Sequence, residues 1–401
     1  MTEGSRQTGT AREVFLAFLK LGLTAFGGPI AHLGYFRAEF VLRRRWLSEA
    51  EYADLVALCQ FLPGPASSQA GFALGLQRAG PLGALAAWTG FTLPSAALLV
   101  AFAFGAAALD GPVAQGVLGG LKLVAVAVVA QAVWGMAQSL APDGQRAGIA
   151  LMAVAVTIML GGSAGQVTAI LLGGLAGLLW CRNGVAPARS DMRFSFGPLQ
   201  GAICLAVFAL LLVGLPLLAG VSGWHGLALF DAFYCAGALV FGGGHVVLPL
   251  LDAETVASGW VGRDAFLAGY GAAQAVPGPL FAFAAYLGAV GSLSPNGIVG
   301  AAIALVAIFL PGLLLVLGVL PFWAMLRDRP WAAAAMRGTN AAVVGLLGAA
   351  LYDPVWTSAV LEPRDFVLAL TGFIALTAWR APPWLVVLAL ALAGGAIGYL
   401  G

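Results

Sequence analysis

“ALCQFLPGPASSQAGFALG” (residues 57–75) and “GAAQAVPGPLFAFAAYLGA” (residues 271–289) carry the same pattern, Gln-x-x-Pro-Gly-Pro, inside apolar sequence. Proline ends a helix that approaches it and fits the first turn of the next helix, and glycine adopts almost any backbone angle. Each stretch therefore predicts a helix that breaks in its middle and starts again. A second kind of break is predicted where Phe-Gly-Gly occurs, at residues 26–28 and 241–243.

The composition around these breaks is that of an integral membrane protein. Hydrophobic residues make up 61% of the 401 positions and charged residues 9%, whereas a soluble domain carries about 25% charge. Several apolar runs reach the roughly 20 residues that a helix needs to cross a bilayer. We therefore expect an all-α bundle of membrane helices. The first 20 residues lack the cleavage site of a signal peptide, so we expect them to stay in the mature protein.

The breaks belong to a longer internal repeat. The matching positions are Trp46/Trp260, Gln60/Gln274, Pro63/Pro277 and Pro65/Pro279 at a separation of 214, Phe26-Gly27-Gly28/Phe241-Gly242-Gly243 at 215, Pro94/Pro311 at 217 and Gly120/Gly338 at 218. The separation between matching positions changes only from 214 to 218 along the chain, which favours duplication of the sequence over chance identity. We predict a first repeat over 1–181, an Arg-bearing loop with a linker transmembrane helix over 182–227, and a second repeat over 228–401.

The arginines indicate that the two repeats are inverted, because short loops rich in Lys and Arg stay cytoplasmic. In the first repeat they mark the loops at 37–45 and, after its last helix, at Arg182, Arg189 and Arg193. In the second repeat the equivalent of the first loop is mostly acidic. The arginines appear instead at 327–337, and the counterpart of that loop in the first repeat, around Asp110, has no Lys or Arg. The extra apolar run at 198–218 supplies the crossing that turns the second repeat over. The N-terminus is predicted to be cytoplasmic.

The same charge pattern favours two re-entrant hairpins, over 13–36 and 49–77, and about four crossing helices in each repeat. If both segments crossed the membrane fully, the later loops rich in arginine would lie on the side away from the cytoplasm, against the charge rule. Ser48 and Glu51 form a capping-box pattern at the start of the second hairpin. Whether these segments span or return is left open.

Broken helices are tolerated at membrane depth where they line a cavity or are buried in protein. The second arm of each hairpin would begin near the midplane, with free backbone N–H groups and the positive end of its dipole pointing inward. These starts are predicted at Pro29, Pro65, about Gly244 and Pro279. Four of them around one point would form an anion site, to which Gln60, Ser67, Ser68 and Gln274 would add neutral donors.

Simpler readings compete with this site. A Gly-Pro break is often only a kink. A lone histidine such as His32 or His245 is as often a packing residue as a proton acceptor or a hydrogen-bond donor to the substrate. Lys20, Lys122 and Asn340 lie in apolar runs and are candidates for a charge or proton role, although Lys122 is close enough to a helix end to snorkel to water. The four cysteines, Cys59, Cys181, Cys204 and Cys235, are expected to be packing residues, with no metal site or disulfide framework.

The motifs “FGGPIAHLGYF”, “QFLPGPASSQ”, “FGGGHVVLPLL” and “QAVPGPLFAF” together resemble the chromate ion transporter family in its long, two-domain form. The resemblance covers nearly the whole chain and implies a bacterial or archaeal inner-membrane carrier that exports chromate and confers chromate resistance. Carried over by position, the family's motif residues are Gly27, Gly28, Pro29, Gln60, Pro63, Gly64, Pro65, Gly242, Gly243, Gly244, His245, Pro249, Gln274, Pro277, Gly278 and Pro279.

We therefore expect a secondary carrier that needs no cofactor and holds a tetrahedral oxyanion between its two repeats. A general carrier or channel for sulfate-like oxyanions is the main alternative, because helix N-termini do not distinguish oxyanions of similar size and charge. An enzyme is disfavoured, since H-E-x-x-H does not occur and the three histidines are dispersed. The lipid bilayer is the expected surrounding and no nucleic acid is expected to bind. The coupling ion and the oligomeric state, a homodimer included, are left open.

Overall fold

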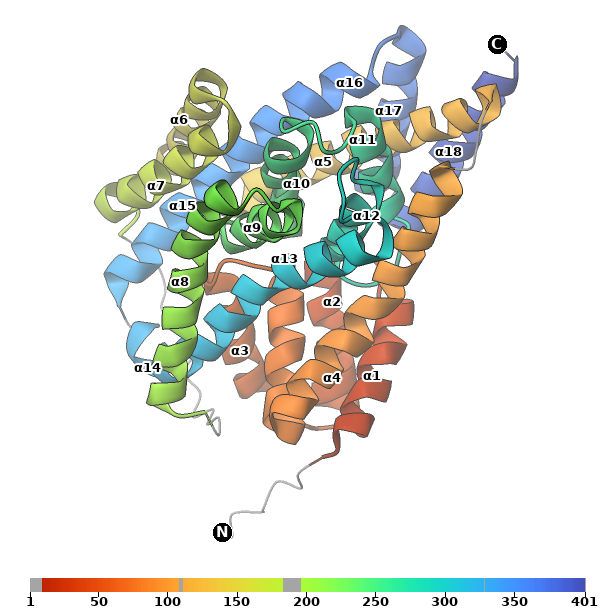
Figure 1. Cartoon of the computed structure of the whole chain (residues 1–401). Coiled ribbons are helices and arrows are strands. Elements are labelled where there is room, and N and C mark those ends of the chain that lie inside the picture. The colour runs from red at the N-terminus through yellow and green to blue at the C-terminus, as the bar shows by residue number, and fades with distance from the viewer. Residues whose placement is uncertain (1–8, 108–110, 183–195, 328, 401) are drawn as a thin grey trace.

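The computed structural model describes residues 9–107, 111–182, 196–327 and 329–400, and every regular element within these ranges is helical (Figure 1). Seven helices in this part of the chain are long and apolar enough to cross a membrane: Ala66–Ala106, Pro112–Leu140, Gly162–Trp180, Pro198–Ser222, Gly297–Leu326, Pro330–Ala359 and Pro383–Leu400. The prediction of an all-α membrane protein is confirmed.

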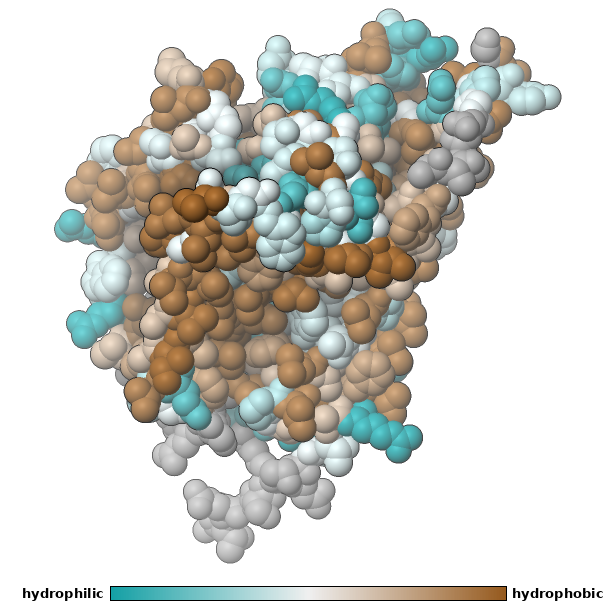
Figure 2. Space-filling view, in the orientation of Figure 1, coloured by the Kyte–Doolittle hydropathy of each residue, from teal (hydrophilic) through white to brown (hydrophobic). Residues whose placement is uncertain are grey.

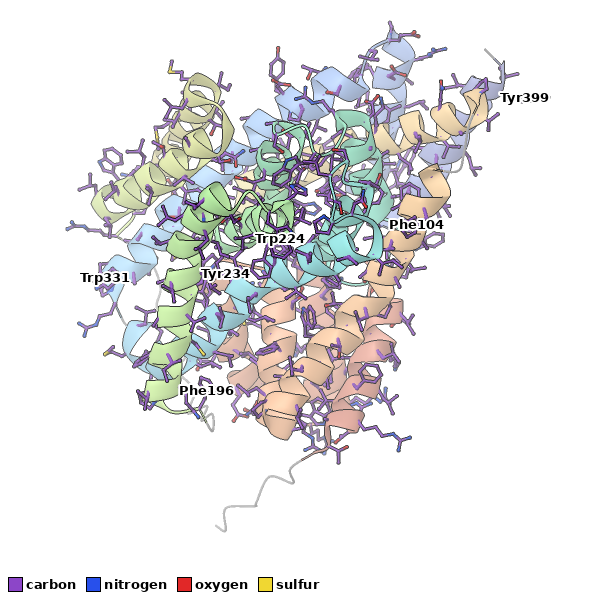
Figure 3. The ribbon with its side chains drawn as sticks, in the orientation of Figure 1. Phe104, Phe196, Trp224, Tyr234, Trp331 and Tyr399 are labelled. Carbon is purple, nitrogen blue, oxygen red and sulfur yellow. The ribbon has the colours of Figure 1, made fainter. Side chains whose placement is uncertain are left out.

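Helix α8 (Pro198–Ser222) is the predicted linker helix, and it faces outward along nearly its whole length. Only 6% of its most apolar window is buried, and Figure 2 shows a continuous brown, hydrophobic surface over it. Phe196 and Trp224 mark its two ends (Figure 3). A helix that is apolar all round and not covered by protein is suited to lipid contact, and Trp is enriched at the membrane interface.

The first half begins with two helical hairpins. The elements are α1 (Ala11–Thr24), α2 (Gly28–Phe36), the π-helical turn η1 (Arg37–Arg43), α3 (Glu49–Phe61), α4 (Ala66–Ala107), α5 (Pro112–Leu140), α6 (Gly144–Leu160) and α7 (Gly162–Trp180). The capping box predicted at Ser48 and Glu51 is present. Helix α4 reverses at Ala79 and Gly80, whose backbone angles are not helical. The backbones of Gly75 and Gly83 then come into close contact, so α4 is itself an antiparallel pair of arms.

The second half has the same kinds of element in the same order. They are α9 (His225–Ala238), η2 (Gly244–Val246), α10 (Val247–Leu251), the π-helical turn η3 (Asp252–Val256), α11 (Arg263–Ala273), η4 (Leu280–Ala282), α12 (Phe283–Val290), α13 (Gly297–Val319), η5 (Leu320–Phe322), α14 (Trp323–Leu326), α15 (Pro330–Ala350), η6 (Leu351–Trp356), α16 (Thr357–Ala359), α17 (Pro363–Thr377) and α18 (Pro383–Leu400). This order supports the predicted duplication. The boundary predicted at 228 falls inside α9, and the division into domains stays a prediction.

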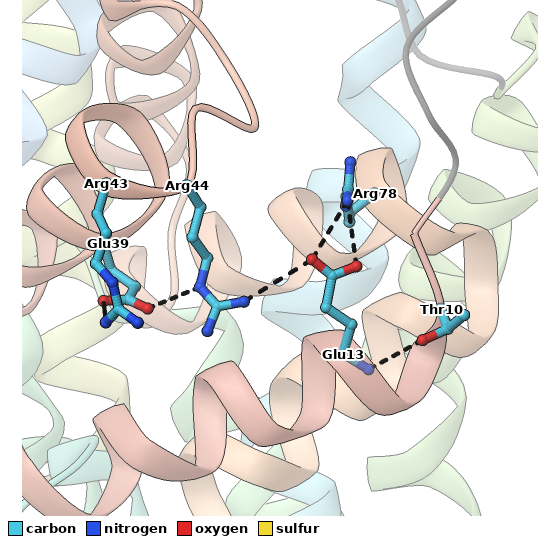
Figure 4. Close-up of polar contacts among 6 residues, drawn as sticks. All are labelled: Thr10, Glu13, Glu39, Arg43, Arg44 and Arg78. Atoms are coloured by element: carbon cyan, nitrogen blue, oxygen red, sulfur yellow. Dashed lines mark hydrogen bonds and ion pairs between the residues drawn. The ribbon is translucent and has the colours of Figure 1, made fainter.

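Each hairpin of the first half begins and ends at one face of the molecule, as Figure 4 shows for its charged residues. Glu13, in the first turn of α1, lies 3.8 Å from Arg44, which follows η1, and 3.2 Å from Arg78, which ends the first arm of α4. The ring of Trp46 lies under both guanidinium groups, at 5.5 and 5.3 Å. Segments 13–36 and 49–77 therefore both return to where they started. We call this the arginine face.

The hairpins of the second half return in the same way at a different place. The ring of His225, which begins α9, lies 4.6 Å from the ring of Trp260. The carbonyl of Trp260 accepts a hydrogen bond of 2.9 Å from the backbone N–H of Ser292, beyond α12. Trp260 is the repeat partner of Trp46, so both tryptophans mark the mouths of equivalent hairpins.

Two arginines of the second half join it to the first half. Arg327 pairs with Asp54 at 2.8 Å, and Arg337 donates to the carbonyl of Cys181 at 2.8 Å, so the arginines of the second half lie against first-half segments. Asp110, Arg189 and Arg193, which were also used to predict inversion, lie outside the described residues. The inverted placement in a membrane stays a prediction.

The two halves exchange helices across their interface. Helix α5 packs on α18 of the other half, where Gly120 contacts the Leu390 backbone, and α15 packs on α7, where Gly338 contacts the Gly173 backbone. Small residues allow two membrane helices to approach this closely. Since Gly120 and Gly338 are repeat partners, the two contacts are equivalent.

Candidate functional site

All four helix breaks meet in the middle of the protein, in what we call the central junction. The backbone N–H of Gly64 donates to the carbonyl of Val240 at 2.7 Å, and that of Gly278 donates to the carbonyl of Ala25 at 2.9 Å. These two bonds are repeat equivalents, and each joins the second break of one half to the first break of the other. A third contact brings Pro29 against Gly244, where an added Cβ would lie 3.3 Å from the proline ring.

Glycine is required at the junction for two physical reasons. Gly64 and Gly278 have φ values of +119° and +100°, which residues other than glycine rarely adopt. There is also no room for a side chain, because a Cβ at Gly278 would collide with Ser95 Oγ and one at Gly64 would lie 3.1 Å from the Cα of Gly312. The breaks are therefore packed against the opposite half and are not free kinks.

A cavity of about 110 Å³ opens beside the junction. A single ordered water needs about 10–15 Å³ on a comparable measure, so the space suits a small anion or several waters. The residues that line it come from three of the four breaks and from α5, α11 and the start of α18: Gly27, Gly28, Val128, Gln131, His245, Ala273, Gln274, Val276, Gly278, Leu280 and Pro383.

The described lining offers hydrogen-bond donors and carries no carboxylate. The first turn of α2 has backbone N–H groups without a helical acceptor, and its cap Gly27 and first residue Gly28 line the cavity. Gln131 and Gln274 contribute side-chain amides. Nδ1 of His245 lies 2.7 Å from the Tyr270 hydroxyl, which leaves Nε2 as the ring nitrogen available to a ligand. Neutral donors and helix N-termini in a carboxylate-free cavity favour an anion.

Five of the predicted site residues line this cavity, namely Gly27, Gly28, His245, Gln274 and Gly278. The other predicted residues of the four breaks surround the cavity or lie in the junction. Pro29 contacts Gly244, Gly64 donates to Val240, and Pro65 packs on Gly312. The Pro63 carbonyl accepts a hydrogen bond from Gln69, the Pro277 carbonyl accepts one from Ser95, and Pro279 precedes the lining residue Leu280. Gly242 faces α5 and α15, Gly243 caps η2, and Pro249 is buried in α10.

The duplicated glutamines are not used alike. Gln274 lines the cavity, whereas its repeat partner Gln60 is exposed at the end of α3. Ser67 and Ser68 are buried in the first turn of α4 rather than in the cavity wall. Of the four predicted helix starts, three contribute to the cavity, and the start beside Pro65 is closed by the contacts of Gly64 and Gly312.

The charged candidates lie away from the cavity. Lys122 reaches Asp264 at 2.9 Å, and 79% of that carboxylate side chain is exposed, which fits the predicted snorkelling. Lys20 lies 3.8 Å from Glu39 near the arginine face. Asn340 is on α15, where its Oδ1 is buried without a hydrogen-bond partner. His32 is buried in α2, and its Nδ1 lies 3.4 Å from Ser67 Oγ.

Sequence reasoning missed two residues of the site, Gln131 in the cavity wall and Tyr270 in contact with His245. Gln131 interrupts the apolar run of α5, and that isolated amide was the available signal. Tyr270 orients His245 from α11, and no local pattern pointed to it because its partner is distant in the chain.

Comparisons with known proteins agree with this architecture. A family profile described as “Chromate transporter” matches residues 12–178 and 227–395. A protein named chromate transport protein from Pseudomonas aeruginosa is 29% identical over 394 residues, covering 97% of this chain and 92% of the relative. A probable chromate transport protein from Synechococcus elongatus is 29% identical, covering 94% and 93%. The chromate transport protein of Cupriavidus metallidurans is 27% identical, covering 92% and 87%. No solved structure matches the chain.

Proposed function

The chain belongs to the chromate transporter family, and from this premise we propose that it is a secondary transporter that exports chromate across the inner membrane of a bacterial or archaeal cell. The central cavity would hold the tetrahedral dianion between the two halves. The observation that carries this proposal is the meeting of four helix breaks beside a cavity lined by helix starts, amides and one imidazole, with no carboxylate among its described residues.

The binding chemistry follows from these donors. Backbone N–H groups at Gly27 and Gly28, the amides of Gln131 and Gln274, and the free nitrogen of His245 would surround the oxyanion. No Lys or Arg lines the cavity in the described part of the chain. Binding by dipoles and neutral donors holds a dianion without a full counter-charge, which also allows the anion to leave on the other side.

The membrane potential suffices to drive export. A dianion that leaves a cell with a negative interior gains about 4.6 kcal/mol at 100 mV, which is twice the ~2.3 kcal/mol per elementary charge. Neither ATP nor a resident cofactor is needed for this step.

Chromate flux in proteoliposomes tests the proposal. The purified chain is reconstituted, a potential is imposed, and radiolabelled chromate movement is measured with excess sulfate on either side. We expect potential-driven chromate flux that sulfate barely inhibits. Equal inhibition or counterflow by sulfate would favour the general oxyanion carrier. If correctly inserted protein moves no chromate, the proposal is refuted.

A further inference from the structure

A cluster of buried polar side chains lies in the first half beside the central junction. We call it the hydroxyl cluster, and its members are fully or almost fully buried: His32, Ser67, Ser68, Thr92 and Ser95. His32 contacts Ser67 and packs edge-on against Phe91, the neighbour of Thr92, with ring centroids 5.2 Å apart. Because Gly75 meets Gly83 across the two arms of α4, the antiparallel register places Ser67 opposite Phe91 and Ser68 opposite Gly90, within two positions of Thr92.

Several atoms of the cluster have no partner. His32 Nε2, Ser68 Oγ and Thr92 Oγ1 are buried without a hydrogen bond. An unsatisfied buried polar atom costs about 1–3 kcal/mol, so three of them on α2 and the two arms of α4 call for an explanation.

The fold itself does not require these polar groups. At the repeat separations of 214, 215 and 217, their counterparts in the second half are Val247, Phe281, Ala282, Phe309 and Gly312. None of the five has a polar side chain, and all are buried in equivalent elements. Since the second half forms the same hairpins with an apolar interior, the polar residues of the first half are retained for a role other than packing.

The cluster is linked to the cavity along one face of α2. Gly28, which lines the cavity, and His32 are four residues apart, so their side-chain positions lie one helical turn apart on the same face. At the other end, Ser95 Oγ donates to the carbonyl of Pro277 at 2.6 Å, next to the cavity residue Gly278.

From this geometry we propose that His32 is a proton-binding site coupled to the central anion site, so that a dianion and one proton are bound together. The inference rests on the proposed function. A proton on the imidazole places a positive charge one helical turn from Gly28 of the cavity, while the Ser67 hydroxyl, 3.4 Å from Nδ1, accepts a hydrogen bond from the charged ring. Anion binding then favours protonation, and protonation favours the anion to the same degree, because such coupling is reciprocal.

The other titratable groups on the elements around α2 are engaged, buried or exposed at the surface: Asp54 of α3 pairs with Arg327, and Tyr35 of α2 is exposed. The Tyr52 hydroxyl of α3 donates to the carbonyl of Leu33, and Cys59 of α3 is fully buried. Glu39 and Arg43 of η1 pair with each other, Arg37 pairs with Glu49, and Arg78 of α4 pairs with Glu13 at the arginine face. Among the described titratable groups on these elements, His32 is therefore the one that we assign to proton binding beside the cavity, whereas His245 lies in the cavity wall.

Proton uptake on anion binding tests the coupling. Purified full-length protein in weakly buffered detergent solution is titrated with chromate at mildly alkaline pH, where free chromate is a dianion, and an indicator dye reports protons. We expect the wild type to take up close to one proton for each chromate bound. His32→Gln should still bind chromate, more weakly, and take up none. His225→Gln, at the mouth of the second-half hairpins, should behave as the wild type.

Two further variants keep the test decisive. His32→Val places in the first half the residue found at the equivalent position of the second, so it should fold, and it should also abolish uptake. Ser67→Ala should preserve chromate binding and shift the pH at which uptake is half complete. Wild-type binding without proton uptake, or undiminished uptake by both His32 variants, would overturn the inference while leaving chromate transport intact. If no variant and no wild-type protein bound chromate, the proposed function would fail as well.

Discussion

At Gly28 the backbone conformation alone requires glycine. Its φ is +79°, and a Cβ built there meets no other atom within 4 Å. Alanine would therefore fit the space and still strain the backbone by about 1–2 kcal/mol. We predict that Gly28→Ala inserts normally and transports chromate several-fold more slowly, because the strain displaces donors of the cavity. Gly64→Val adds a clash with Gly312 to the same strain and should abolish transport.

The matched control for this residue is in the same helix. Gly34 also has open space around its Cβ position but a helical backbone, so Gly34→Ala should leave initial rates in proteoliposomes unchanged. Equal rates for Gly28→Ala, Gly34→Ala and the wild type, at equal amounts of inserted protein, would argue against a site formed by the start of α2.

Asp252 makes stability depend on pH outside the transmembrane helices. Burial raises the pKa of this carboxyl to about 6, with Asp353 adding to the rise and Arg263 opposing it. Because the folded pKa lies above the unfolded value of about 3.9, its contribution to stability is complete below about pH 4 and is lost as pH rises through 6. Asp252→Asn should raise the Tm at pH 7 and leave it unchanged at pH 4. Identical Tm shifts at both pH values would contradict this assignment.

Between elements, the exchanged helix pairs depend on single glycines. Gly120 of α5 touches the Leu390 backbone of α18, whereas its neighbour Gly119 has nothing within 4 Å of its Cβ position. We predict that Gly120→Ala separates α5 from α18, lowers the Tm in detergent and reduces transport. Gly119→Ala is the control and should be neutral or slightly stabilising, because alanine has a higher helix propensity by about 1 kcal/mol. Similar Tm values for the two variants would show that the α5–α18 contact is not tight.

The positions of the breaks could be predicted from the sequence because Gly, Pro and capping residues act locally. Helix α2 begins at Gly28, beside the predicted Pro29, and η2 begins at the predicted Gly244. The capping box at Ser48 was predicted for the same reason. The cavity was harder to predict, since Gln131 lines it, and Tyr270 contacts its lining residue His245, from helices that are distant in sequence and carry no motif.

Over the whole molecule, the duplicated sequence does not give equal surroundings to equal residues. Gln60 and Gln274 occupy matching positions, yet the first is exposed and the second lines the cavity. No local pattern could predict this, because it depends on which distant segments pack beside each glutamine. In carriers built from inverted repeats, alternating access is largely a rocking of one repeat against the other around a fixed site, and we propose the same motion here.

Alternating access therefore predicts that the two glutamine positions exchange their exposure. In a background without the four native cysteines, Gln60→Cys should react quickly with an impermeant maleimide added on one side of the membrane, and Gln274→Cys slowly from the other. Chromate supplied on the Gln274 side should reverse that order, because it draws the carrier toward the state open there. Ser258→Cys, in the exposed segment after η3, should label at a constant rate. Rates at positions 60 and 274 that rise and fall together would instead indicate a channel with one continuous path.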